Sequence, residues 1–260
     1  MTFEIIFGVI LPFIGTLLGA GCVIFTKGNI SPKVHCSLLG FSGGIMVAAS
    51  IWSLILPAID SASWLGRLSF LPAVIGFLSG CFFLLLVEWG VPLLKKRLYS
   101  NKNDNKIKST TMLVFAVGLH NIPEGMAVGA VFAGLLASGT GITLTEAICL
   151  SIGIAIQNIP EGAIISLPLR AEGRSRTAAL AAGIVSGIVE PIGAALTLLA
   201  VGYILPILPF LLGFAAGAMI YVVISELVPK MSESGVMWLG EIMFSIGFSV
   251  MMILDVVFGG

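Results

Sequence analysis

The stretch LHNIPEG, Leu119 to Gly125, places a histidine, an asparagine, a proline and a glutamate inside an otherwise apolar run. Thirty-seven residues later the chain repeats most of this pattern as IQNIPEG, Ile156 to Gly162. Polar and ionisable groups are costly in the hydrocarbon core of a membrane, and those found there usually serve a function. The repeated pattern therefore indicates a membrane-embedded fold with a polar site inside it.

The composition supports this interpretation. Of the 260 residues, 58% are hydrophobic and 10% are charged, whereas a soluble domain carries roughly 25% charged residues. The net charge is zero and no basic or acidic tail is present, so we expect no nucleic-acid partner. We expect an integral membrane protein in the lipid bilayer, with residues 1–260 forming one polytopic domain.

Eight apolar runs are long enough to cross a bilayer. They are continuous rather than alternating, so they predict helices, and the fold class is all-α. The runs fall at about 4–26, 36–58, 70–94, 110–137, 143–168, 178–202, 206–229 and 238–259.

Positive charges predict the orientation of these spans. The loops between spans 1 and 2, 3 and 4, 5 and 6, and 7 and 8 hold 12 of the 13 Lys and Arg residues. The positive-inside rule places these loops in the cytoplasm and both termini outside. The longest of them, residues 95–109, is expected to be a basic cytoplasmic loop.

Two outer spans resemble each other. The stretch FSGGIMVAASIWSLILP (41–57) in span 2 is similar to FAAGAMIYVVISELVP (214–229) in span 7. An even and an odd span cross in opposite directions, so the similarity predicts an inverted repeat, an architecture that many transporters use.

Three carboxylates converge near the middle of the membrane. At 1.5 Å per residue, Glu124, Glu161 and Glu190 all lie near mid-depth of their spans. His120 and Asn121 share a helix face with Glu124, and Gln157 and Asn158 share one with Glu161. Two facing helices built this way could hold two cations, with Glu124 and Glu161 bridging them.

The two prolines are expected to shape these helices. Pro123 and Pro160 lack an N–H, which frees the carbonyls of Leu119 and Ile156 and predicts a bend in spans 4 and 5. Transporter sites are often built where membrane helices break in this way.

The buried charges need compensation, because each mid-membrane carboxylate costs about 2.5–3.5 kcal/mol. No Lys or Arg lies between Lys108 and Arg170 or between Arg176 and Lys230. Compensation is therefore expected from protons or bound cations. Protonated carboxylates acting only as hydrogen-bonded glue are the structural alternative, and a proton relay alone would not need the matching amides. Carboxylate, imidazole and amide oxygen together suit Zn²⁺, Fe²⁺ or Mn²⁺.

In these residues the chain resembles the ZIP family of divalent metal transporters, and the resemblance covers essentially its whole length. The segments HNIPEG, QNIPEG and SGIVEPIG match the metal-binding helices of that family, and Gln157 points to its GufA-type, ZupT-like branch. The resemblance implies a first metal position formed by His120, Glu124, Gln157 and Glu161. It implies a second position formed by Asn121, Glu124, Asn158, Glu161 and Glu190, where the amide of Asn158 weakens the charge.

The resemblance also implies uptake through the cell (plasma or inner) membrane into the cytoplasm, and a homodimer. Ser53 and Asp60 are expected to line the entrance, whereas Glu226 and Glu88 are expected to receive the released ion. Asp255 and Glu241, in span 8, have no expected role.

We therefore expect a transporter, not an enzyme. Its substrate would be Zn²⁺, with Fe²⁺, Mn²⁺ and Cd²⁺ as further candidates, and it would need no organic cofactor. An ion-coupled carrier of a small organic solute is the main alternative, although such a site usually offers a basic residue or helix N-termini to its substrate. An intramembrane metalloenzyme is a weaker one, because the chain has no HExxH motif.

Overall fold

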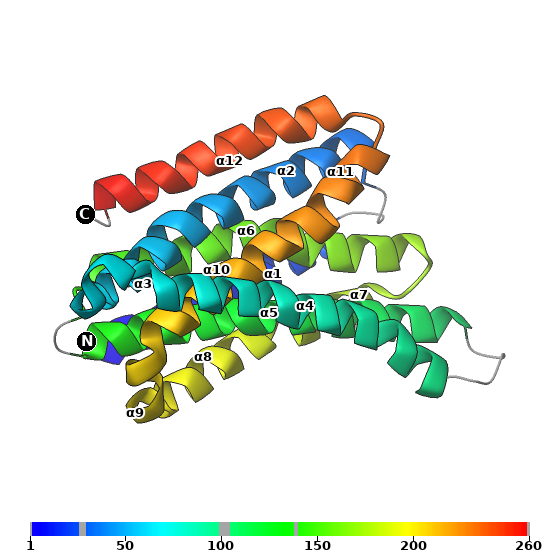
Figure 1. The fold of residues 1–260 in the computed structure, drawn as a ribbon. Coiled ribbons are helices and arrows are strands. Elements are labelled where there is room, and N and C mark those ends of the chain that lie inside the picture. The colour runs from blue at the N-terminus through cyan, green and yellow to red at the C-terminus, as the bar shows by residue number, and fades with distance from the viewer. Residues whose placement is uncertain (1, 26–29, 99–104, 138–139, 259–260) are drawn as a thin grey trace.

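The computed structural model describes residues 2–25, 30–98, 105–137 and 140–258, with side chains described outside 91–117. Every regular element in these ranges is helical. The long helices lie side by side in a bundle, and α1 begins at the same end of the bundle where α12 ends (Figure 1).

The long helices are α1 (Thr2–Gly21), α2 (Pro32–Ala49), α4 (Phe70–Leu98), α5 (Asn105–Leu136), α6 (Leu144–Ala171), α7 (Arg176–Gly187), α8 (Val189–Leu199), α10 (Leu208–Val222) and α12 (Met237–Phe258). Three short helices are α3 (Leu56–Ser61), α9 (Val201–Ile204) and α11 (Val228–Glu233). Tight 3₁₀ turns cover Cys22–Ile24, Ser63–Leu68 and Leu205–Ile207, and wide π-helical segments cover Ser50–Ile55 and Val223–Leu227.

Seven stretches of the described chain are long and apolar enough to cross a membrane: Thr2–Ile24, Pro32–Ser61, Phe70–Gly90, Leu144–Ala171, Arg176–Leu199, Val201–Glu233 and Met237–Phe258. The expectation of an all-helical, multi-span membrane protein is therefore confirmed. Helix α5 is not among the seven, and its described part carries His120, Asn121 and Glu124, which lower its hydropathy.

The basic cytoplasmic loop expected at 95–109 stays a prediction. Helix α4 continues to Leu98 and α5 already begins at Asn105, so helical ends cover much of this stretch. Residues 99–104 lie outside the described part of the chain.

The bends expected at the two motif prolines are not confirmed. Helices α5 and α6 each run as one element through Pro123 and Pro160. The interruption instead falls in the span that carries Glu190, where Ile188 separates α7 from α8.

The two similar outer spans share a structural feature. Each changes from an α-helix to a π-helical segment, at Ser50–Ile55 and at Val223–Leu227. A proline near the start of the next helix follows in both cases, Pro57 and Pro229. Proline cannot donate to the preceding turn, which favours such a local widening. The inverted repeat stays a prediction, and this parallel supports it.

Glycines allow the helices around the motifs to touch. A Cβ on Gly125 would overlap the backbone carbonyl of Glu190, and a Cβ on Gly162 would overlap that of Thr16. Helix α5 therefore packs backbone-to-backbone on α8, and α6 packs on α1, as small residues permit in membrane bundles. These two approaches bring four helices to one point, where the polar site lies.

Candidate metal-binding site

Glu190 is the centre of a buried hydrogen-bond cluster. Its Oε1 accepts from Thr16 Oγ1 at 3.0 Å and from Asn121 Nδ2 at 3.1 Å. Its Oε2 accepts from Asn158 Nδ2 at 2.7 Å. Glu190 is 1% exposed and Asn158 is fully buried, so α1, α5, α6 and α8 are joined through one carboxylate.

Both asparagines of this cluster also donate to the backbone. Asn121 Nδ2 lies 3.1 Å from the carbonyl oxygen of Ser186, and Asn158 Nδ2 lies 3.3 Å from that of Pro12. These contacts fix the side-chain amides with their N–H groups toward Glu190. The Oδ1 of Asn158 consequently points away from Glu190. It is buried, and no described residue donates a hydrogen bond to it.

A second buried pair joins the two repeated motifs. Gln157 Nε2 donates to Glu124 Oε1 at 2.9 Å, and the backbone carbonyl of Gln157 accepts from Ser42 Oγ at 3.1 Å. Glu124 is 3% exposed and Gln157 is fully buried. No described residue donates a hydrogen bond to Glu124 Oε2 or Gln157 Oε1. Buried acceptor oxygens without a donor are rare in proteins, and a cation would satisfy them.

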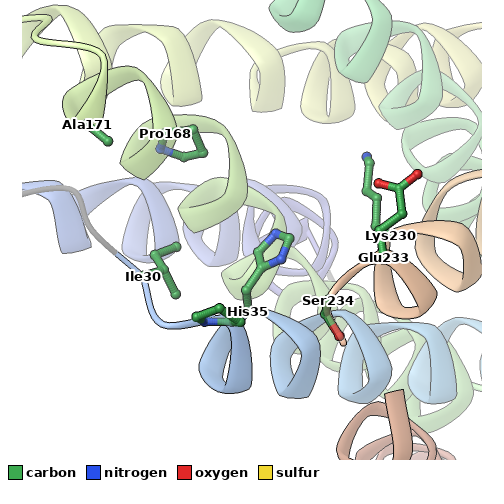
Figure 2. A pocket seen from close by; sticks show the side chains of 8 residues that line it. Ile30, His35, Pro168, Ala171, Lys230, Glu233 and Ser234 are labelled. Carbon is green, nitrogen blue, oxygen red and sulfur yellow. The ribbon is translucent and has the colours of Figure 1, made fainter. Parts of the chain in front are cut away.

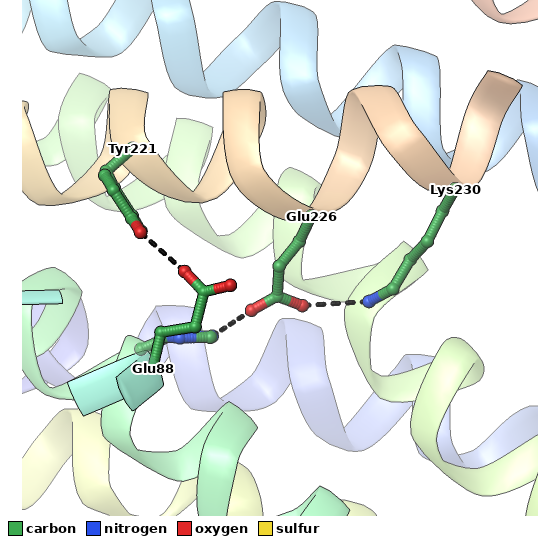
Figure 3. Close-up of polar contacts among 5 residues, drawn as sticks. Glu88, Tyr221, Glu226 and Lys230 are labelled. Atoms are coloured by element: carbon green, nitrogen blue, oxygen red, sulfur yellow. Dashed lines mark hydrogen bonds and ion pairs between the residues drawn. The ribbon is translucent and has the colours of Figure 1, made fainter. Parts of the chain in front are cut away.

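His120 is paired outside the motif. Its Nδ1 lies 2.7 Å from Glu226 Oε1, and Glu226 Oε2 lies 2.8 Å from Lys230 Nζ. Glu226 thus lies between the histidine and the lysine, and Figure 3 shows its contact with Lys230. Nearby, Tyr221 donates its hydroxyl proton to Glu88 Oε2 at 2.5 Å.

A small cavity of about 40 Å³ lies among these groups. Its polar lining consists of His120, Asn121, Glu124, Glu161, Glu226 and Lys230. A volume of this order accommodates only one or a few water-sized groups. Its lining thus combines carboxylate, imidazole and amide donors around a space suited to a single ion.

The lining corrects one expectation about charge. The absence of Lys and Arg from the expected spans predicted that only protons or bound cations would balance the glutamates. Helix α11 extends the seventh span to Glu233, so Lys230 lies on a helix instead of in a loop and reaches the cavity. One positive charge of the protein itself therefore faces the carboxylates.

The structure brings the expected ligands together only in part. Of the first expected metal position, Glu124 and Gln157 are hydrogen-bonded, and His120 and Glu161 line the same cavity as Glu124. Of the second, Asn121 and Asn158 are joined to Glu190. Among the described residues, no three His, Cys, Asp or Glu side chains gather closely enough to hold a metal ion. The glutamates are instead contacted by amides: Gln157 donates to Glu124, and Asn121 and Asn158 donate to Glu190.

The expected entrance gains a carboxylate that had no role in the sequence analysis. Ser53 Oγ donates to Asp255 Oδ1 at 2.6 Å, and Asp255 is buried at 8% exposure. Its Oδ2 is buried, and no described residue donates a hydrogen bond to it. Asp60, expected beside Ser53, is exposed in α3. A carboxylate inside an apolar run was the available signal for Asp255.

Comparison with known proteins places this geometry in a family. The family model described as ZIP Zinc transporter matches residues 105–255, which include both repeated motifs and Glu190. The protein named zinc transporter ZIP11 of Homo sapiens is 32% identical, with 99% of this chain and 98% of the relative covered.

Two bacterial relatives agree. The zinc transporter ZIPB of Bordetella bronchiseptica is 33% identical, with 95% of this chain and 79% of the relative covered. The zinc transporter GufA of Myxococcus xanthus is 32% identical, with 94% of this chain and 96% of the relative covered.

Proposed function

The chain belongs to the ZIP zinc transporter family, and from this premise we propose that it imports divalent transition-metal cations into the cytoplasm, with Zn²⁺ as its main substrate. Membership in the family indicates a metal ion transporter rather than an enzyme.

The observation that carries the proposal is the unsatisfied oxygen atoms of the hydrogen-bonded Glu124–Gln157 pair. No described residue donates a hydrogen bond to the buried Glu124 Oε2 or Gln157 Oε1, and Glu124 lines the small cavity together with Glu161 and His120. A buried carboxylate without a partner is costly. A dehydrated cation that binds these oxygens removes that cost, so the same groups that destabilise the empty site favour its occupation.

We propose that the transported cation binds in this cavity, with Glu124, Glu161 and His120 as its principal ligands and Gln157 as a further oxygen donor. These side chains must move closer together than the structure holds them to share one ion. Oxygen ligands with one imidazole suit Zn²⁺ and its competitors Fe²⁺, Mn²⁺ and Cd²⁺. Asn121 lines the same cavity, but its amide nitrogen donates to Glu190.

A second cation at Asn121, Asn158 and Glu190 is the weaker part of the binuclear expectation. Glu190 already accepts three hydrogen bonds, and a metal ion there would have to displace donors from Thr16, Asn121 and Asn158. Hydrogen bonds to a charged group contribute about 1.5–3 kcal/mol each. We therefore propose that one ion occupies the cavity and that Glu190 stabilises the helices around it.

The path follows from the placement of the outer residues. In this proposal Ser53, Asp60 and Asp255 together receive the ion from outside. Glu226, bonded to His120, accepts it from the cavity and passes it toward Glu88 and the cytoplasm. In this proposal α5 is the eighth crossing, both termini are extracytoplasmic, and the protein is a homodimer in the plasma or inner membrane.

Uptake into proteoliposomes tests the proposal. Purified protein in liposomes that contain a zinc-sensitive dye should accumulate Zn²⁺ faster than protein-free liposomes. Cd²⁺, Fe²⁺ and Mn²⁺ should each compete with Zn²⁺ for uptake. Mg²⁺ should not compete, because it prefers oxygen ligands to an imidazole. Uptake no faster than in protein-free liposomes would contradict the proposal.

A further inference from the structure

A second, larger cavity shares the lining residue Lys230 with the small cavity described above, which we call the metal cavity. It has a volume of about 540 Å³, and we call it the vestibule. Its lining includes Ile30, His35, Pro168, Lys230, Glu233 and Ser234. Figure 2 shows Lys230 and Glu233 on one helix and His35 on another, around the same space. Among the described lining residues of both cavities, Lys230 is the one they share.

Lys230 is held by a carboxylate of the metal path. Its Nζ lies 2.8 Å from Glu226 Oε2, while Glu226 Oε1 lies 2.7 Å from His120 Nδ1. The side chains of Lys230, Glu226 and His120 are 39%, 27% and 16% exposed. Glu226 Oε2 is therefore in contact with Lys230 (Figure 3) and Oε1 with His120, and Lys230 lines both the metal cavity and the vestibule.

The charges give this arrangement a direction. Glu124, Glu161 and Glu226 line the metal cavity, and Lys230 is the cationic side chain among its described lining residues. An ammonium group and a metal cation repel each other and are attracted to the same carboxylates. Glu226 can serve as a ligand through Oε2 only when Lys230 has moved away from it.

We propose that Lys230 is a tethered competitor of the transported metal ion. Between transport cycles its ammonium group neutralises Glu226. An ion that moves from the cavity to Glu226 displaces Lys230 toward the vestibule, and the return of Lys230 to Glu226 expels the ion toward Glu88 and the cytoplasm. Lys230 thus acts through Glu226 as a positioning residue that weakens binding and speeds release. This inference rests on the proposed transport function.

Three substitutions separate the charge from the contact. Lys230→Met keeps the length of the side chain and removes its charge. Lys230→Gln removes the charge but can still donate a hydrogen bond to Glu226, so it protects the fold. Lys230→Arg keeps the charge. Lys33→Met is the matched control, because Lys33 is an exposed lysine near the start of α2 that lines neither described cavity.

The first measurement is equilibrium binding of Cd²⁺ and Zn²⁺ to purified protein, together with initial rates of uptake into proteoliposomes. Removing a positive charge close to a divalent ion should tighten binding by about tenfold or more. Lys230→Met and Lys230→Gln should both show tighter binding, with a lower KM and a lower kcat. Lys230→Arg and Lys33→Met should resemble the wild type.

The second measurement uses the wild-type protein, so it does not depend on a variant that folds. Amine-reactive labelling with detection by mass spectrometry should show that Zn²⁺ increases the reactivity of Lys230 and leaves that of Lys33 unchanged. Unchanged binding in folded Lys230→Gln, or labelling of Lys230 that does not respond to Zn²⁺, would overturn the inference. A wild-type protein that transports no metal would instead overturn the proposed function.

Discussion

Asn158 donates a hydrogen bond of 2.7 Å to Glu190, and the two buried side chains link α6 to α8 at the centre of the membrane domain. The amide N–H of Asn158 therefore places a positive partial charge against Glu190. If this position held a second carboxylate, a metal ion bound between the two carboxylates would have the same effect. In the one-ion proposal, this relationship stabilises the centre of the bundle without a second cation.

Replacement of Asn158 by aspartate should reverse this situation. Asn158→Asp removes the donor and places a like charge beside Glu190, so in metal-free buffer we expect a loss of about 1–3 kcal/mol in stability. Added Zn²⁺ should restore it, and the number of bound ions should rise from one to two. Thermal unfolding in detergent and equilibrium dialysis measure both effects. A variant with wild-type Tm and one bound ion would contradict the role given to Asn158.

Thr16 should contribute through its hydroxyl group. Thr16→Val keeps the shape of the side chain and removes the donor to Glu190 Oε1, which should cost about 1.5–3 kcal/mol because the acceptor is charged. Thr16→Ser keeps the hydroxyl and should lose much less. Tm values of the two variants test this, and equal values would show that the hydrogen bond contributes little.

The close contact at Gly125 should be intolerant of a side chain. In Gly125→Ala the new Cβ would overlap the backbone carbonyl of Glu190, so α5 and α8 must separate and the yield of folded protein should fall sharply. Gly90→Ala and Gly202→Ala are matched controls, because a Cβ at either position meets no described atom within 4 Å. Size-exclusion profiles of the three variants provide the measurement, and a monodisperse Gly125→Ala protein would contradict the packing argument.

His120 should set the preference among metals. An imidazole ligand favours Zn²⁺ over Mn²⁺, so His120→Ala should reduce Zn²⁺ uptake more than Mn²⁺ uptake, changing their ratio by about tenfold. His35→Ala is the control, because His35 is the other of the two histidines in the chain and lines the vestibule instead. Equal losses for both metals would mean that His120 is not a ligand of the transported ion.

Asp255 should act on the capture of the ion. Asp255 is buried beside Ser53, and no described residue donates a hydrogen bond to its Oδ2. Asp255→Asn removes the negative charge, so KM for uptake should rise several-fold, by about threefold or more, with kcat little changed. Glu241→Gln is a suitable control, because Glu241 is exposed on the same helix. A fall in kcat at constant KM would place Asp255 elsewhere in the cycle.

The central residues of the site were predictable because their signal is local. Glu124, Glu161 and Glu190 stand out as carboxylates in apolar runs, and the i,i+3 and i,i+4 spacing puts the amides on the same helix faces. Their convergence follows from helix rise and span limits, and the structure places Glu124 and Glu161 on one cavity.

Other contacts depend on neighbours that helix spacing does not reveal. Thr16 is one hydroxyl group in an apolar helix, and only packing through Gly162 brings it to Glu190. Lys230 directly follows the predicted end of the seventh span at residue 229, so it is expected in a loop. In the structure the helix continues to Glu233. The pairing of His120 with Glu226 likewise joins two helices far apart in sequence.

Uptake of Zn²⁺ by the Glu124→Ala/Glu161→Ala double variant tests the central claim most directly. The variant would be compared with wild type and with Glu241→Gln in the same proteoliposomes, after size-exclusion and circular-dichroism profiles show that each is folded. The account predicts that uptake by the folded double variant falls to the level of protein-free liposomes while Glu241→Gln retains the wild-type rate. Uptake by the double variant at the wild-type rate would contradict the claim that these two glutamates bind the transported ion.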